Sequence, residues 1–210
     1  MGALSLVVLL VLKNLGQRIS GVKMDKINWS KLKQANGNAS HIPSALEKLK
    51  SPNPAQRKEA YWLLENYIVV QGGIYEAAYY TIPFLIELIE QRSNGKLEAY
   101  NLLIEILAGY EVDGAVIVIN GISTALNLAC RRRIANSEDI FFREILLAEA
   151  CWNYALSVLA LLAENYPGII DRMESNLPTI DIPQIAKAVS EQIQQCRADR
   201  VSDIISPQSN

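Results

Sequence analysis

Four glutamates recur about once per expected helix, and carboxylates in pairs are side chains that do chemistry. They are Glu47, Glu65, Glu87 and Glu105. Two carboxylates perform acid–base catalysis only when they lie a few ångströms apart in a cleft. Glutamates at repeat-related positions more often lie in solvent or pair with Lys and Arg. We therefore expect these four to be solvated or ion-paired, and we predict no catalytic residue.

Histidine and cysteine add little further chemistry. His41 is the only histidine, so a His-rich metal site is excluded and any Ser-His-Asp or Cys-His set would have to include it. Cys130, Cys151 and Cys196 are widely spaced and odd in number, which suits a reducing compartment and buried, inert thiols. The chain carries no phosphate-binding loop and no dinucleotide fingerprint. We predict neither a metal nor a cofactor.

The stretch 71–76 combines glycine, tyrosine and glutamate in a loop between helices. Loops on one face of a helical array often form its binding surface. The alternative is a plain helix stop at Gly72-Gly73, with a tyrosine covering the edge of the core. Gln71, Tyr75 and Glu76 are candidate partner-binding residues.

One basic cluster and one aromatic group supply the other candidates. Three consecutive arginines at a helix end either complement the helix dipole in solvent or meet an acidic partner. Aromatic residues concentrate near residues 61–80, where helical spacing places most of them in the core. Tyr79 and Tyr80 are adjacent, so we expect one of them to be exposed or at an interface. The candidates are Trp62, Tyr79, Tyr80, Arg131, Arg132 and Arg133.

Short phrases repeat at a spacing near 40 residues, and this indicates the elements that position these side chains. Ile42–Leu49 returns as Ile82–Ile89, and Glu59–Leu64 returns as Glu98–Leu103. Such a period is typical of stacked helix pairs, since one pair alone leaves its apolar side uncovered. Hydrophobic residues make up 50% of the chain and charged residues 20%, which indicates a folded core. We predict an all-α fold over residues 24–205.

The apolar stripes and the Gly and Pro positions predict individual helices. A proline at 83 either opens a helical segment or kinks a longer helix. Ile122, Ala125, Leu126 and Ala129 keep the apolar register of the earlier units and are expected in a helix. Val116–Ile119 is strand-like, but its neighbours favour helix. The expected helices span residues 40–50, 55–71, 77 to about 92, 96–108, 138–165 and 182–205.

The two ends of the chain are separate from this domain. Residues 3–12 are ten residues dominated by apolar side chains, too few to cross a bilayer, which takes about 20 residues. Three interpretations of residues 1–23 stay open: a mis-assigned start with the natural one at Met24, a helix that packs on the array or on a membrane surface, and a weak signal anchor. Residues 206–210 are expected to be a frayed tail.

The segment Leu49–Ala60, with its Ser-Pro-Asn-Pro turn, resembles the turn of a HEAT repeat. In this comparison Arg57 matches the family's inward-reaching arginine and Ala60 its small residue at the helix contact. Gln71–Leu85 looks like a group of small bacterial HEAT-like proteins. The resemblance covers Ile42–Leu107 well and implies an α-solenoid of HEAT-like helix pairs. The later units lack the Pro-x-Pro turn and its arginine.

The resemblance and the lack of a catalytic set lead us to expect a non-catalytic protein-binding module in the bacterial cytoplasm, an adaptor or a toxin-immunity protein. One alternative is a HEAT-like bilin lyase acting on a chromophore-carrying partner, which needs an acid–tyrosine cluster on the concave face. Another is a HEAT-like DNA repair protein, for which Trp62 and Trp152 are available. The net charge of −2 argues against nucleic acid. Membrane contact is expected only if residues 1–23 are native.

Overall fold

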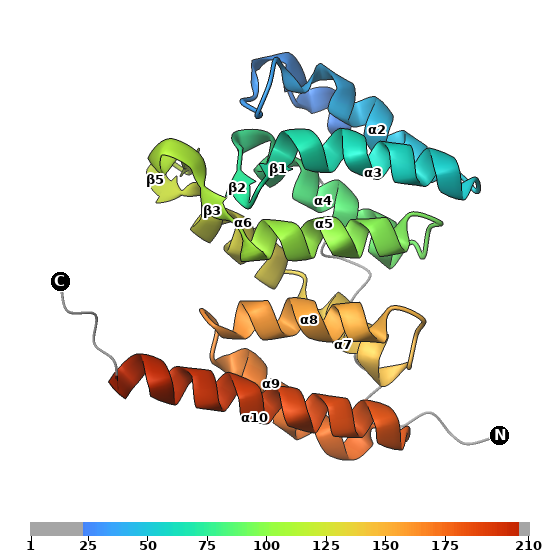
Figure 1. Ribbon diagram of the computed structural model, residues 1–210, viewed down its shortest axis with the longest axis vertical. Helices are drawn as coiled ribbons and strands as arrows, with labels where there is room; N and C mark the ends of the chain where they lie inside the picture. The colour runs from blue at the N-terminus through green and yellow to red at the C-terminus, as the bar shows by residue number, and fades with distance from the viewer. Residues whose placement is uncertain (1–22, 206–210) are drawn as a thin grey trace.

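The computed structural model describes residues 23–205, and the expectations for the apolar N-terminal segment and the C-terminal tail fall almost wholly outside this range (Figure 1). The described chain is mostly helical, as expected, with small sheets in addition. Its α-helices are α2 Ile42–Leu49, α3 Pro54–Ile68, α4 Glu76–Glu90, α5 Lys96–Ala108, α6 Leu126–Ala135, α7 Glu138–Leu146, α8 Trp152–Ala163, α9 Gly168–Asn176 and α10 Pro183–Ile205.

Short elements connect these helices. The 3-10 turns are η2 Met24–Lys26, η3 Trp29–Lys31, η4 Ala39–His41, η5 Val112–Gly114 and η6 Leu177–Thr179. The strands are β1 Val69–Val70, β2 Gly73–Ile74, β3 Tyr110–Glu111, β4 Val116–Ile119 and β5 Ile122–Ala125.

The helices pack pairwise in chain order. α2 contacts α3, α4 contacts α5, α7 contacts α8, and α9 contacts α10. In addition, α3, α5, α8 and α10 contact one another in succession and form the row nearest the viewer in Figure 1. α4 contacts α2 and α6 behind this row, and a continuous apolar core joins the two sides.

Local sequence explains where α3 starts and which side it buries. The Asn53 side chain caps the helix by accepting a hydrogen bond from the Ala55 amide at 2.9 Å, and Pro54 occupies the first turn, where a missing N–H costs nothing. Ala60, Leu64 and Ile68 follow at a spacing of four residues and are fully buried. α4 runs without interruption through Pro83, so the idea that this proline opens a new helical segment is wrong.

The helix expected to reach Gln71 ends at Ile68, because the chain turns into a small sheet. β1 pairs antiparallel with β2, and β2 pairs parallel with β3. Gln71 and Gly72 form the turn with φ values of 50° and 79°, a backbone region that favours glycine. The two glycines therefore build a hairpin rather than a plain helix stop.

The prediction of a helix around Ile122 is wrong for residues 122–125. β4 and β5 form an antiparallel hairpin, and the helix begins only at Leu126. Asn120 and Gly121 at its tip have φ values of 51° and 81°, as a two-residue turn requires. The Asn-Gly pair and its β-branched flanks outweigh the apolar register. Ile122 is consequently 68% exposed.

The single helix expected over residues 138–165 is two helices. α7 ends at Leu146 and α8 begins at Trp152, with Ala148 at a φ of 50° in the turn between them. The Glu144 carboxylate accepts the Cys151 backbone N–H at 3.1 Å and holds the turn. This break lets α8 fold back on α7 and bury a second apolar side.

Candidate functional site: the α3–α5 surface

The residues singled out in the sequence do not converge on one site. Trp62 lies on α3 in the front row. Tyr79 and Tyr80 lie on α4, and Arg133 on α6, behind that row. Gln71 lies at the exposed β1–β2 turn. Trp62 is therefore the only one of these candidates on the outer side of α3.

The three arginines point to different partners. The Arg131 guanidinium donates to the carbonyls of Leu107 at 2.7 Å and Leu161 at 2.8 Å, and pairs with Glu164 at 3.0 Å. Its side chain is only 14% exposed, so it links the C-terminal ends of α5 and α8 instead of lying in solvent.

The other two arginines have different surroundings. The Arg133 guanidinium carbon lies 4.2 Å from the centre of the Tyr79 ring, whereas Arg132 is exposed. These arginines do not form one basic patch.

The remaining candidates take part in the protein's own packing. Tyr79 and Tyr80 are both partly buried, with ring centres 5.3 Å apart, so neither is fully exposed. Burial, followed by the nearby Glu76, raises the pKa of Tyr80. The Glu76 carboxylate accepts the Lys33 backbone N–H at 3.0 Å, and Tyr75 is partly buried.

The four repeated glutamates fall into two groups. Glu47 pairs with Lys50 at 2.7 Å, and Glu87 accepts a hydrogen bond from Gln91 at 2.7 Å, in line with the expected solvated or paired state. Glu105 is exposed.

Glu65 differs from the other glutamates. One of its carboxylate oxygens is buried without a hydrogen-bond partner among the described residues. Burial and the neighbouring Glu105 raise the pKa of Glu65. Glu65 is therefore only partly solvated, and it has no ion pair among the described residues.

Glu65 and Glu105 lie near each other because α3 and α5 run side by side. Arg57 on α3 pairs with Glu98 on α5 at 3.1 Å. One turn further along each helix, Tyr61 and Asn101 line the same pocket. After one more turn, about 6 Å, come the two carboxylates. Burial, then Glu105 and Glu65, raises the pKa of Tyr61, so the phenol is close to both acids.

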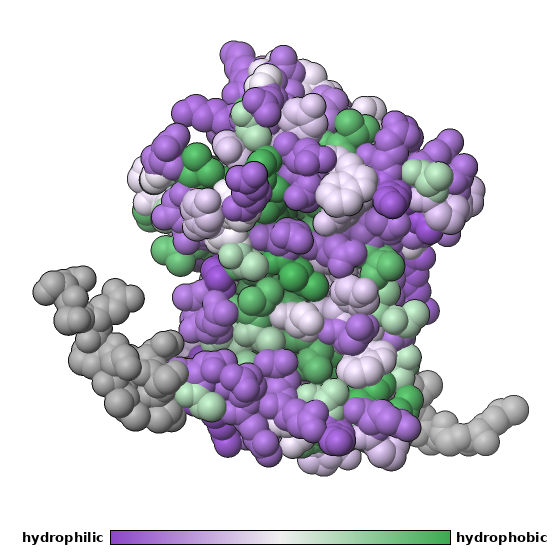
Figure 2. Space-filling view, viewed as in Figure 1, coloured by the Kyte–Doolittle hydropathy of each residue, from purple (hydrophilic) through white to green (hydrophobic). Residues whose placement is uncertain are grey.

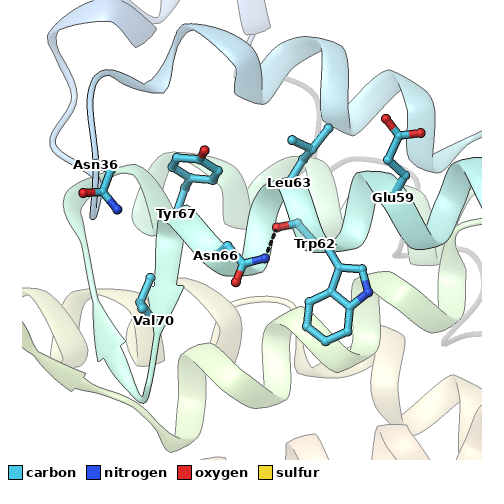
Figure 3. A pocket seen from close by; sticks show the side chains of 7 residues that line it. All are labelled: Asn36, Glu59, Trp62, Leu63, Asn66, Tyr67 and Val70. Atoms are coloured by element: carbon cyan, nitrogen blue, oxygen red, sulfur yellow. Dashed lines mark hydrogen bonds between the residues drawn. The ribbon is translucent and has the colours of Figure 1, made fainter.

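Two hollows flank the Trp62 side chain. One of about 590 Å³ is lined by Asn36, Glu59, Trp62, Leu63, Asn66, Tyr67 and Val70, and Figure 3 shows the indole pointing away from Glu59 and Leu63. The other, of about 310 Å³, is lined by Lys58, Tyr61, Trp62, Leu97, Glu98 and Asn101. We call the outer surface formed by Tyr61, Trp62, Glu65, Leu97, Asn101 and Glu105 the Trp62 face.

The Trp62 face combines exposed aromatic area with acidic groups. Trp62 is 47% exposed and Leu97 is 41% exposed, and the Trp62 ring meets the Tyr61 ring edge-on at 5.1 Å. Figure 2 shows hydrophilic residues over much of the end of the molecule that contains α3. Hydrophobic residues gather over α8 on the same side of the molecule (Figure 2). The exposed apolar side chains of this face can be buried against another molecule, and its acidic groups can bind a cation.

The two buried thiols of this protein are poorly suited to act as nucleophiles or metal ligands. Burial raises the pKa of the Cys130 thiol to about 12, and burial also raises that of Cys151. Both side chains are buried as expected, whereas Cys196 is partly exposed. Within residues 23–205, no three His, Cys, Asp or Glu side chains gather where they would hold a metal ion.

Sequence reasoning named Trp62 but missed that Glu105 lies close enough to Glu65 to raise its pKa. The signal was present in the repeat, because a 40-residue period places a residue beside its counterpart in the next pair. Comparison of the chain with protein-family models, curated protein sequences and solved structures finds no significant match. The HEAT resemblance therefore stays a prediction. Over the described part of the chain, no helix combines the length and the apolar character needed to cross a membrane.

Proposed function

We propose that this chain is a non-catalytic protein-binding module of the bacterial cytoplasm, an adaptor or a toxin-immunity protein, built as a HEAT-like α-solenoid. The pairwise packing of the helices and the succession of α3, α5, α8 and α10 support the solenoid. Arg57 also supports the HEAT resemblance. It is 18% exposed and donates to the Ser51 and Pro52 carbonyls and to Glu98, which ties one helix pair to the next.

The observation that carries the proposal is the half-exposed Trp62 between two hollows. Burying an indole against a partner removes much apolar area from water at little entropic cost, and tryptophan is enriched among residues that dominate binding energy. Tyr61 extends the same apolar area along α3, and Leu97 extends it onto α5. A partner that covers this surface would bury all three side chains together.

A pull-down from native lysate tests the proposal. The full chain is expected to capture one protein in stoichiometric amount, and the Trp62→Ala variant is expected to lose it. The Tyr110→Ala variant is the control, because Tyr110 is 60% exposed but lies on β3, outside the Trp62 face. Equal capture by all three proteins would contradict the proposed surface.

A bilin lyase is the second candidate, favoured by one observation. Tyr61, Glu65 and Glu105 lie near one another, which supports the acid–tyrosine cluster expected for this candidate but not its position on a concave face. Mixing the protein with a bilin would then change the absorbance spectrum of the pigment, and Tyr61→Phe would reduce the change. An unchanged spectrum would eliminate this candidate.

A nucleic-acid-binding function receives less support. Trp62 shares its surface with Glu65 and Glu105, and the guanidinium groups of Arg131 and Arg133 contact other parts of the protein. Salt-sensitive binding to duplex DNA would be needed to restore it.

A further inference from the structure

We propose that the Trp62 face binds a basic segment of its protein partner, with one lysine or arginine side chain lying along the aromatic rings and its charged group at Glu65 and Glu105. This inference rests on the proposed function and names the chemistry of the partner. It rests on three observations. Two neighbouring carboxylates have no ion pair, an aromatic surface lies next to them, and the spacing along α3 and α5 matches the length of one long basic side chain.

The acidic pair is the first observation. Other carboxylates on or near α3 and α5 already have cations: Glu59 pairs with Lys48 at 2.6 Å, and Glu98 pairs with Arg57 at 3.1 Å. Within the described residues, Glu65 and Glu105 have no such ion pair. Two neighbouring carboxylates repel each other, so a cation placed between them gains more than one placed at a single exposed acid.

The aromatic surface is the second observation. Lysine and arginine bury their alkyl stems on apolar area while the charged group stays polar. A cation over the face of an indole is attracted by the ring, most strongly in tryptophan. Trp62 presents this ring at the wall of both hollows, and Tyr61 continues it toward the acids.

The spacing of these residues along α3 and α5 is the third observation. Tyr61 and Glu65 are four residues apart on α3, and Asn101 and Glu105 are four residues apart on α5. One such step is about 6 Å along a helix. This is close to the length of an extended lysine or arginine stem, so a side chain that starts beside Tyr61 reaches both carboxylates.

Selection from a random library identifies the chemistry that this face prefers. The probe is a phage-displayed library of twelve-residue peptides, selected on the immobilised full chain after removal of phage that bind Trp62→Ala. The selected peptides are expected to carry Lys or Arg next to an apolar residue. Acidic or uncharged selected peptides would overturn the inference.

Titration of the best synthetic peptide then tests the two carboxylates. Glu65→Gln combined with Glu105→Gln is expected to weaken binding about tenfold or more, the size of a lost charge-assisted contact. The control pair Asp171→Asn and Asp181→Asn removes the same formal charge from exposed sites outside this face and should change the affinity less than about twofold.

Replacing the basic residue of the peptide by citrulline or acetyl-lysine completes a double-mutant cycle between the peptide and the protein. It should weaken binding to the wild type and have little further effect on the double variant. Equal affinity of the wild type and the glutamine pair would overturn the inference.

The failure of this inference and the failure of the proposed function give different results. If peptides or the lysate partner require Trp62 but tolerate the glutamine pair, the binding module stands and the basic segment is wrong. If no peptide remains after removal of phage that bind Trp62→Ala, and no lysate protein requires Trp62, both are wrong. Circular dichroism of each variant shows that the helical fold is retained.

Discussion

Glu65 is a carboxylate whose environment opposes its charge. It is partly buried on α3, one of its carboxylate oxygens has no hydrogen-bond partner among the described residues, and Glu105 lies close. The raised pKa means that folding disfavours the charged carboxylate relative to the unfolded chain. A residue held in this way costs stability, which is common where a surface is shaped for a partner.

Glu65→Gln is therefore expected to stabilise the protein at pH 7, by about 0.2–1 kcal/mol, the range for partly exposed charge pairs. Because the pKa is raised in the folded state, the wild-type acid is favourable below its ordinary value of 4.5 and becomes unfavourable as the pH rises. The gain from glutamine should thus shrink below pH 4.5. Urea unfolding at several pH values measures it, and an equal gain at every pH would contradict this explanation.

Arg131 shows how one side chain serves two helices. Its guanidinium binds the last carbonyls of α5 and α8, where the helix dipoles are negative and backbone acceptors lack partners. Arg131→Met removes both hydrogen bonds and leaves these carbonyls unsatisfied. The free energy of unfolding should fall by about 2–3 kcal/mol.

Arg132→Met is the matched control for this change. Arg132 is exposed and adjacent in the chain, so its replacement should alter the free energy of unfolding by less than about 0.5 kcal/mol. Urea denaturation of both variants gives the comparison. Similar effects of the two substitutions would show that the carbonyl contacts of Arg131 contribute little.

At the scale of elements, glycines mark where helices approach closely. Gly95 precedes α5, and a Cβ there would lie 3.0 Å from the carbonyl carbon of Leu49 at the end of α2. Backbone does not move aside as a flexible side chain does. The close contact between these two helix ends therefore requires glycine.

Gly95→Ala should lower the free energy of unfolding by about 1–3 kcal/mol, as overpacking does. Gly168→Ala is the control, because a Cβ at Gly168 would meet nothing within 4 Å and alanine favours the helix that starts there. The control should be neutral or stabilising in thermal unfolding. A tolerated Gly95→Ala would show that α2 and α5 separate easily.

At the scale of the whole molecule, a buried ion pair joins the α2–α6 part to the α7–α10 part. Lys96 on α5 pairs with Glu144 on α7 at 2.7 Å and with Glu149 at 3.4 Å, and Arg92 also pairs with Glu149. The side chains of Lys96 and Glu144 are 12% and 6% exposed. Removing one partner would leave a buried charge uncompensated.

Lys96→Met is expected to cost about 3–5 kcal/mol for this reason. If the helix pairs form the proposed solenoid, each unit contacts mainly its neighbours, and weakening one junction also separates the unfolding of the two parts. We expect two urea transitions in place of one. Lys187→Met, at a 77% exposed side chain, should leave a single transition and nearly unchanged stability.

The sequence by itself determined the helical class, most helix positions in residues 40–108, and the buried stripe of α3. These follow from local rules: apolar spacing, Asn and Pro at helix starts, and a period near 40 residues. It also named Trp62 among the aromatic candidates near residues 61–80.

Tertiary structure decided the rest. The separate roles of Arg131 and Arg133 depend on contacts with segments far away in the chain. The β4–β5 hairpin and the break between α7 and α8 are held by neighbouring residues, and the apolar register of the sequence concealed them. The raised pKa of Glu65 depends first on its burial and then on Glu105 from the neighbouring helix. Packing sets these features because the energy of a charge or an apolar side chain depends on what surrounds it, and only the folded chain brings those surroundings together.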